Sequence, residues 1–438
     1  MNRQILHLAI PSIVSNITVP LLGLVDVAIT GHMGDSRYMA AIAVGSMVFN
    51  IIYWMFSFLR FGTGGLTAQA YGASPDSCGE ILVRSQIVSL SIACVLLLLQ
   101  WPLFEAAMWL IEPEAGLVDV IHTYFSICIW GTIPSLALYA LTGWFVGMQN
   151  TKLPMVVSIT QNIINIAVSS LLVYVFKMKI EGVALGTLIA QWCGFLIALM
   201  MVRVKYYNGK WKMGNGKSFA RATYLRLSGY KEYFSVSRVL FLRTLFLVAV
   251  NLWFIVAGAK GGGDILSVNS VLMQMFILYT YVMDGFAFAA EALCGRYYGA
   301  NDKASFDLAL RGVWIFSIAL TILYTLAYAI GGEAFLCLLT DNESVREAAQ
   351  DYLPWAIAIP VCGIAAFVWD GVFVGITETK GMLWGTFSGA VAFFVLYYTL
   401  YPYLHNHALW LAFNAYLFMR GLIQHFIWTK RQKNLVVS

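Results

Sequence analysis

Charged side chains are scarce in this 438-residue chain: Asp, Glu, Lys and Arg make up 11% of it, whereas 60% of the residues are hydrophobic. The mean hydropathy is +0.75. Soluble domains carry roughly a quarter charged residues, so this composition excludes a soluble enzyme. Apolar stretches long enough to cross the hydrocarbon core of a bilayer recur from end to end, which indicates a membrane protein with many spans.

Several motifs are also absent. The seven cysteines lie mostly inside apolar segments without paired or ligand-type spacing, so we interpret them as core residues and expect no metal site. Gly216-Lys217-Ser218 ends like a phosphate-binding loop, but Trp211 occupies the position of its first glycine and no strand precedes it. Because the sequence has no ATP-binding motif, any active transport across the membrane must be driven by an ion gradient. We expect no cofactor. The basic residues have no globular domain to display them, so we expect no nucleic-acid partner.

Twelve apolar segments are long enough to span the lipid bilayer as helices, which predicts an all-α polytopic membrane protein. They cover residues 8–32, 39–63, 85–111, 121–147, 155–177, 182–205, 233–258, 265–292, 310–336, 352–376, 383–403 and 406–429.

Basic residues predict the orientation of these spans. With the N-terminus inside, the inner loops and tails carry 18 Lys and Arg residues and the outer loops carry five. Positive charge accumulates on the cytoplasmic side, so we expect both termini in the cytoplasm and the chain in the plasma (inner) membrane. Four further arginines lie inside spans near cytoplasmic ends, and we interpret them as side chains that snorkel to the headgroups. They are Arg60, Arg238, Arg243 and Arg420.

The two halves of the chain resemble each other. TAQAYGA (67–73) is echoed by CGRYYGA (294–300), and GWFVGMQNTKLPM (143–155) by GVFVGITETKGM (371–382), at offsets of 227 and 228 residues. Six spans is an even number, so both halves enter the membrane from the same side and the repeat is parallel, with its pseudo-twofold axis along the membrane normal. This predicts two six-helix lobes, at 1–205 and 233–438, joined by a basic cytoplasmic linker at 206–232. Such lobes suit alternating access around a central cleft; duplication kept for packing is the alternative.

Asp26 stands alone in the apolar run SNITVPLLGLVDVAITGH (15–32). A carboxylate inside a span is costly and usually binds a cation or a proton, and an apolar pocket favours its protonated form near neutral pH. The alternative is an acid hydrogen-bonded to neighbouring helices for packing. Pro11 and Pro20 precede Asp26 in the same span. Because proline removes a backbone hydrogen bond, they predict a helix that can bend.

Two more acids lie on one helical face of the span at 265–292. Asp284 and Glu291 are seven residues apart, which is two helical turns. They suggest a polar path into the second lobe or the substrate cleft between lobes. For Glu291, a solvated position at the membrane interface is the alternative.

Five segments closely resemble the multidrug and toxic compound extrusion (MATE) family, and specifically its DinF-type branch. They are SNITVPLLGLVDVAITGH (15–32), GLTAQAYGA (65–73), MDGFAFAAEALCGRYYGA (283–300), WDGVFVGITETKGM (369–382) and NHALWLAF (406–413). The resemblance runs from end to end of the chain. It implies a twelve-helix, two-lobed antiporter, not an enzyme, that expels small organic substrates in exchange for H⁺ or Na⁺. These substrates are amphipathic and often cationic. We expect it to function as a monomer.

The resemblance also implies a cation- or proton-coupling site in the first lobe. Asp26 matches the family's helix-1 Asp, Asn165 the Asn of its helix-5 Asn-x-x-x-Asp pair, and Thr187 its helix-6 Thr. Ser169 replaces the second Asp of that pair, so the site loses one carboxylate. Asp370 matches a second-lobe Asp of sodium-coupled members, but the span at 233–258 lacks the acid that those members also use. Sodium needs several converging oxygens, so proton coupling is favoured.

Two alternatives on the same fold stay open. One is a Na⁺-coupled multidrug exporter, and the other is an exporter of a lipid-linked or metabolite substrate. A cleft lined with Arg and Lys would favour an anionic lipid-linked substrate, whereas we interpret the intramembrane charges of this chain as mainly acidic.

Overall fold

A computed structural model describes residues 1–31, 36–207 and 227–437. Within these residues the fold is all-helical, which confirms the predicted fold class. Most of the predicted linker, residues 208–226, lies outside the described residues, and so do the side chains of Pro20 and Asp26 within the first helix.

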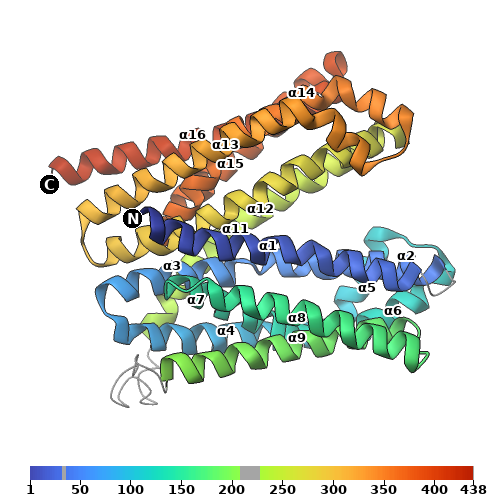
Figure 1. Ribbon diagram of the computed structural model, residues 1–438, viewed down its shortest axis with the longest axis horizontal. Helices are drawn as coiled ribbons and strands as arrows, with labels where there is room; N and C mark the ends of the chain where they lie inside the picture. Colours follow the sequence, from blue (N-terminus) through green and yellow to red (C-terminus); the bar gives the residue numbers. More distant parts are fainter. Residues whose placement is uncertain (32–35, 208–226, 438) are drawn as a thin grey trace. The chain divides into compact units, whose positions relative to one another are not determined.

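The described helices form two compact units, which we call the N-lobe (residues 10–235) and the C-lobe (residues 1–9 and 236–438). Figure 1 shows the course of the helices within each unit. The first helix, α1 (Asn2–Gly31), contributes its first residues to the C-lobe and the rest to the N-lobe. The other N-lobe helices are α2 (Ser36–Met55), α3 (Phe58–Ala73), α4 (Cys78–Leu98), α5 (Gln100–Ile111), α6 (Val118–Cys128), α7 (Thr132–Gly147), α8 (Lys152–Ser170) and α9 (Ile180–Val202).

The C-lobe is built from longer and less interrupted helices. They are α11 (Leu227–Lys260), whose first residues belong to the N-lobe, α12 (Gly263–Gly299), α13 (Lys303–Leu339), α14 (Glu343–Gly375), α15 (Thr379–Leu404) and α16 (Asn406–Val437).

Each predicted span coincides with one helix or with two consecutive helices. Ten helical segments of the described residues have the length and hydropathy to cross a membrane. The segments formed by α1 and α16 are not among these ten. The fold is therefore polytopic and helical as predicted, while the number twelve stays a prediction.

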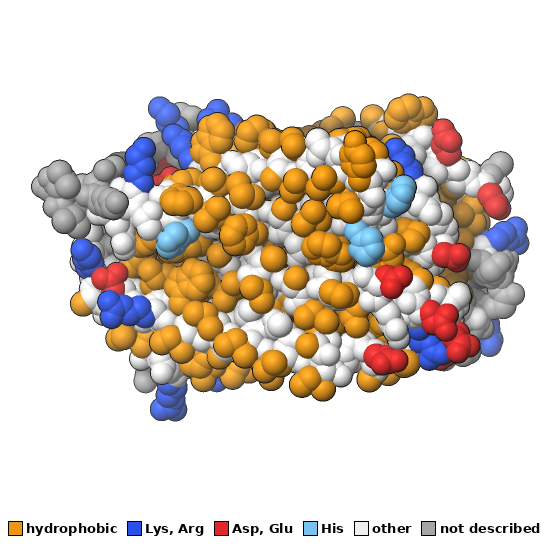
Figure 2. Space-filling view, turned by 90° about the horizontal axis from the view of Figure 1, so that it is seen from above, with side chains coloured by type: hydrophobic (Ala, Val, Ile, Leu, Met, Phe, Trp, Pro, Cys, Tyr) orange, Lys and Arg blue, Asp and Glu red, His pale blue; other side chains and the backbone are white. Residues whose placement is uncertain are grey.

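Exposed apolar side chains are abundant, as the membrane-spanning interpretation requires. On the face shown in Figure 2, hydrophobic side chains cover the middle and most charged side chains gather toward the two ends. This pattern suits an apolar band that contacts lipid.

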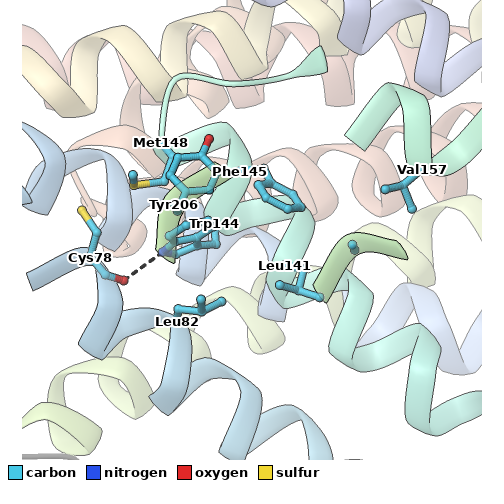
Figure 3. Close-up of a cluster of buried hydrophobic side chains, with 9 residues drawn as sticks. Cys78, Leu82, Leu141, Trp144, Phe145, Met148, Val157 and Tyr206 are labelled. Atoms are coloured by element: carbon cyan, nitrogen blue, oxygen red, sulfur yellow. Dashed lines mark hydrogen bonds between the residues drawn. The ribbon is translucent and has the colours of Figure 1, made fainter. Parts of the chain in front are cut away.

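The N-lobe has a core cluster that holds α4 against α7 (Figure 3). The indole Nε1 of Trp144 donates a hydrogen bond to the backbone oxygen of Cys78 at 2.8 Å. Tyr206 packs edge-on against the Trp144 ring, with 4.9 Å between the ring centroids. Cys78, Cys128 and Cys294 are buried, in agreement with their interpretation as core residues. Cys94 and Cys337 are exposed, so that interpretation is wrong for these two.

The internal repeat is visible in the way helices pack. In the N-lobe, a Cβ at Gly143 of α7 would lie 2.1 Å from the backbone oxygen of Arg60 in α3. In the C-lobe, a Cβ at Gly371 of α14 would lie 2.3 Å from the backbone oxygen of Ala287 in α12. Only glycine permits so close an approach. Because the two contacts are related by offsets of 228 and 227 residues, the sequence repeat corresponds to a repeated helix–helix contact.

Candidate functional site

The polar residues predicted for the N-lobe lie together between α8 and α9. Asn165 and Thr187 are joined by a hydrogen bond, in which Nδ2 of Asn165 donates to Oγ1 of Thr187 at 3.0 Å. Ser169 follows Asn165 by four residues and therefore shares its helix face. A Cβ at Gly186 of α9 would lie 2.1 Å from the Ser169 Oγ, so this glycine lets α9 approach the serine closely. The structure thus brings Asn165, Ser169 and Thr187 together, while their role remains a prediction.

Two oxygen atoms of this N-lobe site are buried without a hydrogen-bond donor. They are Oδ1 of Asn165 and Oγ of Ser169, and neither has a partner among the described residues. Both side chains are fully buried. Leaving such atoms unsatisfied costs about 1–3 kcal/mol each. A proton-bearing group, a water molecule or a cation could satisfy them.

The backbone of α1 places position 26 near this pair. Thr18 contacts α8 through Oγ1, 3.0 Å from the Ser158 Oγ, and its backbone oxygen accepts from Nδ2 of Asn162 at 2.6 Å. The first and fifth helices of an alternating bundle run in the same direction. Eight residues, or about 12 Å, farther along, position 26 of α1 is therefore level with positions 166–170 of α8. This is a statement about the backbone of Asp26, whose side chain lies outside the described set.

The two prolines of the first span lie within an unbroken helix. α1 continues from Asn2 to Gly31 through both Pro11 and Pro20. The Pro11 side chain is buried, and that of Pro20 is outside the described residues. The predicted bending of this helix remains untested.

The C-lobe contains a second polar cluster, which we call the Asp370 cluster: Asp370, Arg243, Arg420 and Gln424. Nη2 of Arg243 and Nη2 of Arg420 both donate to Oδ2 of Asp370. Nε2 of Gln424 donates to the other oxygen, Oδ1, at 2.7 Å. Asp370 thereby ties its own helix, α14, to α11 and α16.

These contacts correct the interpretation of two arginines. Arg243 and Arg420 are predicted to snorkel to the headgroups, but they are 5% and 6% exposed and bind the carboxylate of Asp370, whose side chain is 14% exposed. Arg243 lies ten residues into its predicted span, or about 15 Å, which is near the middle of a hydrocarbon core of about 30 Å. The physical reason for the correction is depth, since a guanidinium there needs a counter-ion within the protein. Arg60 is also buried, so the snorkelling interpretation is wrong for it as well, whereas Arg238 is exposed as a snorkelling side chain would be.

The two acids of α12 differ in burial. Glu291 is 1% exposed, so a solvated position at the membrane interface, the alternative considered from its sequence position, is wrong. Asp284 is half-buried. It has an electrostatic interaction with Arg243, which relates it to the Asp370 cluster.

Sequence reasoning missed the composition of the Asp370 cluster. It selected Asp370 but neither its two arginines nor Gln424. Comparing the depths of charged residues in the membrane could have found the two arginines. Arg243, Asp370 and Arg420 all lie in the cytoplasmic halves of their predicted spans. No group of His, Cys, Asp and Glu suited to a metal ion occurs among the described residues.

Comparison with known proteins identifies the family. The MatE family model matches residues 11–171 and again residues 239–399. The chain is a member of the MatE family. Its two matched segments are related by an offset of 228 residues, which agrees with the repeat seen in the sequence and in the glycine contacts. The members of this family are multidrug and toxin extrusion transporters, and enzymatic activity is not part of the family's function.

Relatives of this MatE chain extend over nearly its whole length. The DNA damage-inducible protein F of Escherichia coli is 34% identical over 434 residues, covering 99% of this chain and 93% of that protein. An Acinetobacter baylyi protein named "Probable multidrug resistance protein NorM" is 22% identical over 418 residues, covering 92% and 88%. A solved outward-facing structure of a multidrug resistance MATE family transporter matches with a TM-score of 0.87 at 16% identity, covering 100% of this chain and 97% of that one, which shows the shared fold.

Proposed function

We propose that this MatE transporter is a secondary antiporter that exports amphipathic organic compounds, often cationic ones, in exchange for protons. The observation that carries the proposal is the N-lobe site, where oxygens of Asn165 and Ser169 have no hydrogen-bond partner among the described residues and lie level with the backbone position of Asp26. Protonation and deprotonation of Asp26 would change the charge of this site by one unit, and that change would be coupled to alternating access.

Protons are favoured over sodium as the coupling ion in both lobes. In the N-lobe, Ser169 supplies a hydroxyl where the family pattern has a carboxylate. In the C-lobe, both oxygens of Asp370 already accept hydrogen bonds from Arg243, Arg420 and Gln424. Two neighbouring guanidinium groups repel a further cation, and sodium requires several converging oxygen ligands. These arguments support proton coupling, with Na⁺ coupling as the alternative.

The orientation, helix number and assembly are part of the proposal. Twelve spans with both termini in the cytoplasm follow from the excess of basic residues in the predicted inner loops. The relationship to a bacterial protein over 99% of the chain supports the inner membrane as the location. We propose a functional monomer whose two lobes rock around a central substrate cleft.

The test uses everted membrane vesicles, in which export appears as uptake of a fluorescent organic cation. A proton gradient and a sodium gradient are imposed separately. We expect the proton gradient alone to drive uptake, and Asp26→Asn to abolish it because the substituted side chain cannot exchange a proton at this site. The matched control is Asp264→Asn, which removes an exposed carboxylate at the start of α12. Uptake driven by sodium alone, or wild-type uptake by Asp26→Asn, would contradict the proposal.

A further inference from the structure

The Asp370 cluster contains more cationic groups than its direct ion pairs balance. Both guanidinium groups donate to the same carboxylate oxygen, Oδ2 of Asp370, while the other oxygen accepts from the neutral amide of Gln424. Buried charges are stable only when partners compensate them. Among the groups in direct contact, a single carboxylate is therefore paired with two guanidinium groups.

Three polar atoms of the cluster are buried without a hydrogen-bond partner among the described residues. They are Nε of Arg243, Nε of Arg420 and Oε1 of Gln424. The residues that carry them are 5%, 6% and 0% exposed. The two Nε groups are cationic donors, and a hydrogen bond to a charged group contributes more than one between neutral groups. The site therefore offers two unused charged donors at one place.

The surroundings of the cluster combine aromatic rings with one more acid. Arg420 lies over the rings of Phe367 and Tyr416, with 5.9 and 6.0 Å from its Cζ to the ring centroids. The half-buried Asp284 of α12 also interacts electrostatically with Arg243. When Asp284 is ionised it partly offsets the positive charge.

We propose that the Asp370 cluster binds the oxyanion group of an amphipathic substrate, such as a carboxylate or a sulfonate. Guanidinium groups match the geometry of oxyanions, and the nearby rings of Phe367 and Tyr416 suit the apolar part of such a molecule. The site would thereby extend the substrates of the exporter to anionic and zwitterionic compounds. The inference rests on the proposed function, because it concerns the substrate class of the same exporter.

The test is binding at equilibrium, which needs no ion gradient. The probes are 2-naphthalenesulfonate and the neutral 2-naphthalenesulfonamide, which share the same ring system. Binding is measured by titration calorimetry on the full chain in nanodiscs of zwitterionic lipid. We expect the wild type to bind the sulfonate at least about tenfold more tightly than the sulfonamide, since a charge-assisted hydrogen bond corresponds to roughly this factor.

Three substitutions test the residues. Arg243→Gln and Arg420→Gln should each weaken sulfonate binding about tenfold or more and leave sulfonamide binding unchanged. Asp284→Asn should strengthen sulfonate binding severalfold, because it removes a competing negative charge. The matched control is Arg431→Gln, which removes an arginine that pairs with Glu378 in a partly exposed position of the same lobe and should have no effect.

Two results would overturn the inference. The first is that both arginine variants fold and bind the sulfonate as tightly as the wild type. This would mean that the cluster only holds the helices together. For the case in which those variants do not fold, Asp370→Asn provides a second route, because it leaves the two guanidiniums intact. Sulfonate should raise the thermal stability of that variant more than sulfonamide does, and equal effects of the two probes are the second contrary result. Failure of binding would leave proton-driven export of cations intact, so the two proposals fail separately.

Discussion

The two lobes repeat the same helix contacts but place their buried polar groups at different repeat positions. In the N-lobe, Asn165 and Ser169 lie on α8, and their counterparts at an offset of 228 residues are Phe393 and Tyr397 of α15. Both counterparts are buried aromatic residues. In the C-lobe, Asp370 lies on α14, and its counterpart at the same offset is Thr142 of α7.

This difference shows that the repeat specifies the packing of the helices but does not specify the buried polar side chains. The glycine contacts of α7 on α3 and of α14 on α12 are equivalent, so the backbone packing is repeated. The polar side chains at the compared positions are not repeated, because α8 buries the neutral oxygens of Asn165 and Ser169, whereas Asp370 of α14 binds two buried guanidiniums. We therefore propose that the two lobes of the exporter have different roles: the N-lobe couples transport to protons, and the C-lobe recognises a charged group of the substrate.

The largest expected effect concerns the stability of the C-lobe. Asp370→Asn leaves two buried guanidiniums without their carboxylate, and breaking a buried ion pair in this way costs about 3–5 kcal/mol. We expect a clearly lower unfolding temperature in detergent, followed by intrinsic tryptophan fluorescence. The control is the repeat counterpart, Thr142→Val, which should change stability by less than about 1 kcal/mol. Equal effects of the two substitutions would show that the cluster does not stabilise the C-lobe.

A second prediction tests the equivalence of the repeated packing. Gly143→Ala and Gly371→Ala each insert a methyl group within 2.1 and 2.3 Å of a backbone oxygen, so neighbouring helices must move apart. Such overpacking costs about 1–3 kcal/mol. We expect similar losses of thermal stability in both variants. Gly331→Ala is the control, because a Cβ there would meet no atom within 4 Å. A loss confined to one lobe would contradict the equivalence.

The fold was predictable because three features can be read directly from the sequence. The long apolar segments predict the spans, the basic loops predict their orientation, and the two spaced motif pairs predict the repeat. The neighbourhood of Asn165, Ser169 and Thr187 was predictable only through resemblance to a family, since neutral side chains inside a span carry no distinct signal of their own. The structure confirms that they lie together.

The partners of Asp370 were not predicted for a physical reason. Helical periodicity shows which residues share a face of one helix, but it does not show which faces of α11, α14 and α16 meet. Arg243 and Arg420 are 177 residues apart, so their shared carboxylate depends on the tertiary fold. Because snorkelling is inferred for each arginine from its own span, it does not account for the burial of Arg60, Arg243 and Arg420 between helices.

A third prediction sharpens the chemical difference between the lobes by adding a charge to the N-lobe site. Ser169→Asp restores the family's second acid near Asp26, and like-charge repulsion favours protonation of the pair. We expect the pH profile of transport to move to higher pH by about one unit, or sodium to begin to inhibit or drive transport. Ser169→Asn, of similar size but uncharged, is the control. If both folded variants keep the wild-type response to pH and sodium, Ser169 lies outside the mechanism.

The smallest expected effect concerns the N-terminal cap of a helix, which is present in the C-lobe and absent at the equivalent position of the N-lobe. Asp302 caps α13 of the C-lobe, where its Oδ1 accepts a hydrogen bond from the backbone N–H of Ser305 at 3.0 Å. The repeat counterpart at an offset of 228 is Ser74, whose side chain makes no capping hydrogen bond. Side-chain and backbone hydrogen bonds from Ser305 hold the pKa of Asp302 below its ordinary value of 3.8.

The sign of the pH dependence follows from that lowered pKa. Because the folded state favours the ionised carboxylate, the cap stabilises the helix start above the ordinary pKa, and this contribution is lost as the pH falls through the lowered folded-state value. We expect Asp302→Ala to accelerate hydrogen exchange in the first turn of α13 slightly at pH 7, and the difference from wild type to shrink progressively below a pH of about 4. Ser74→Ala should produce no such pH-dependent difference at the start of α4. A difference for Asp302→Ala that stays constant down to the lowest pH would mean that the charge of Asp302 does not contribute to the cap, and that the two lobes begin these helices in equivalent ways.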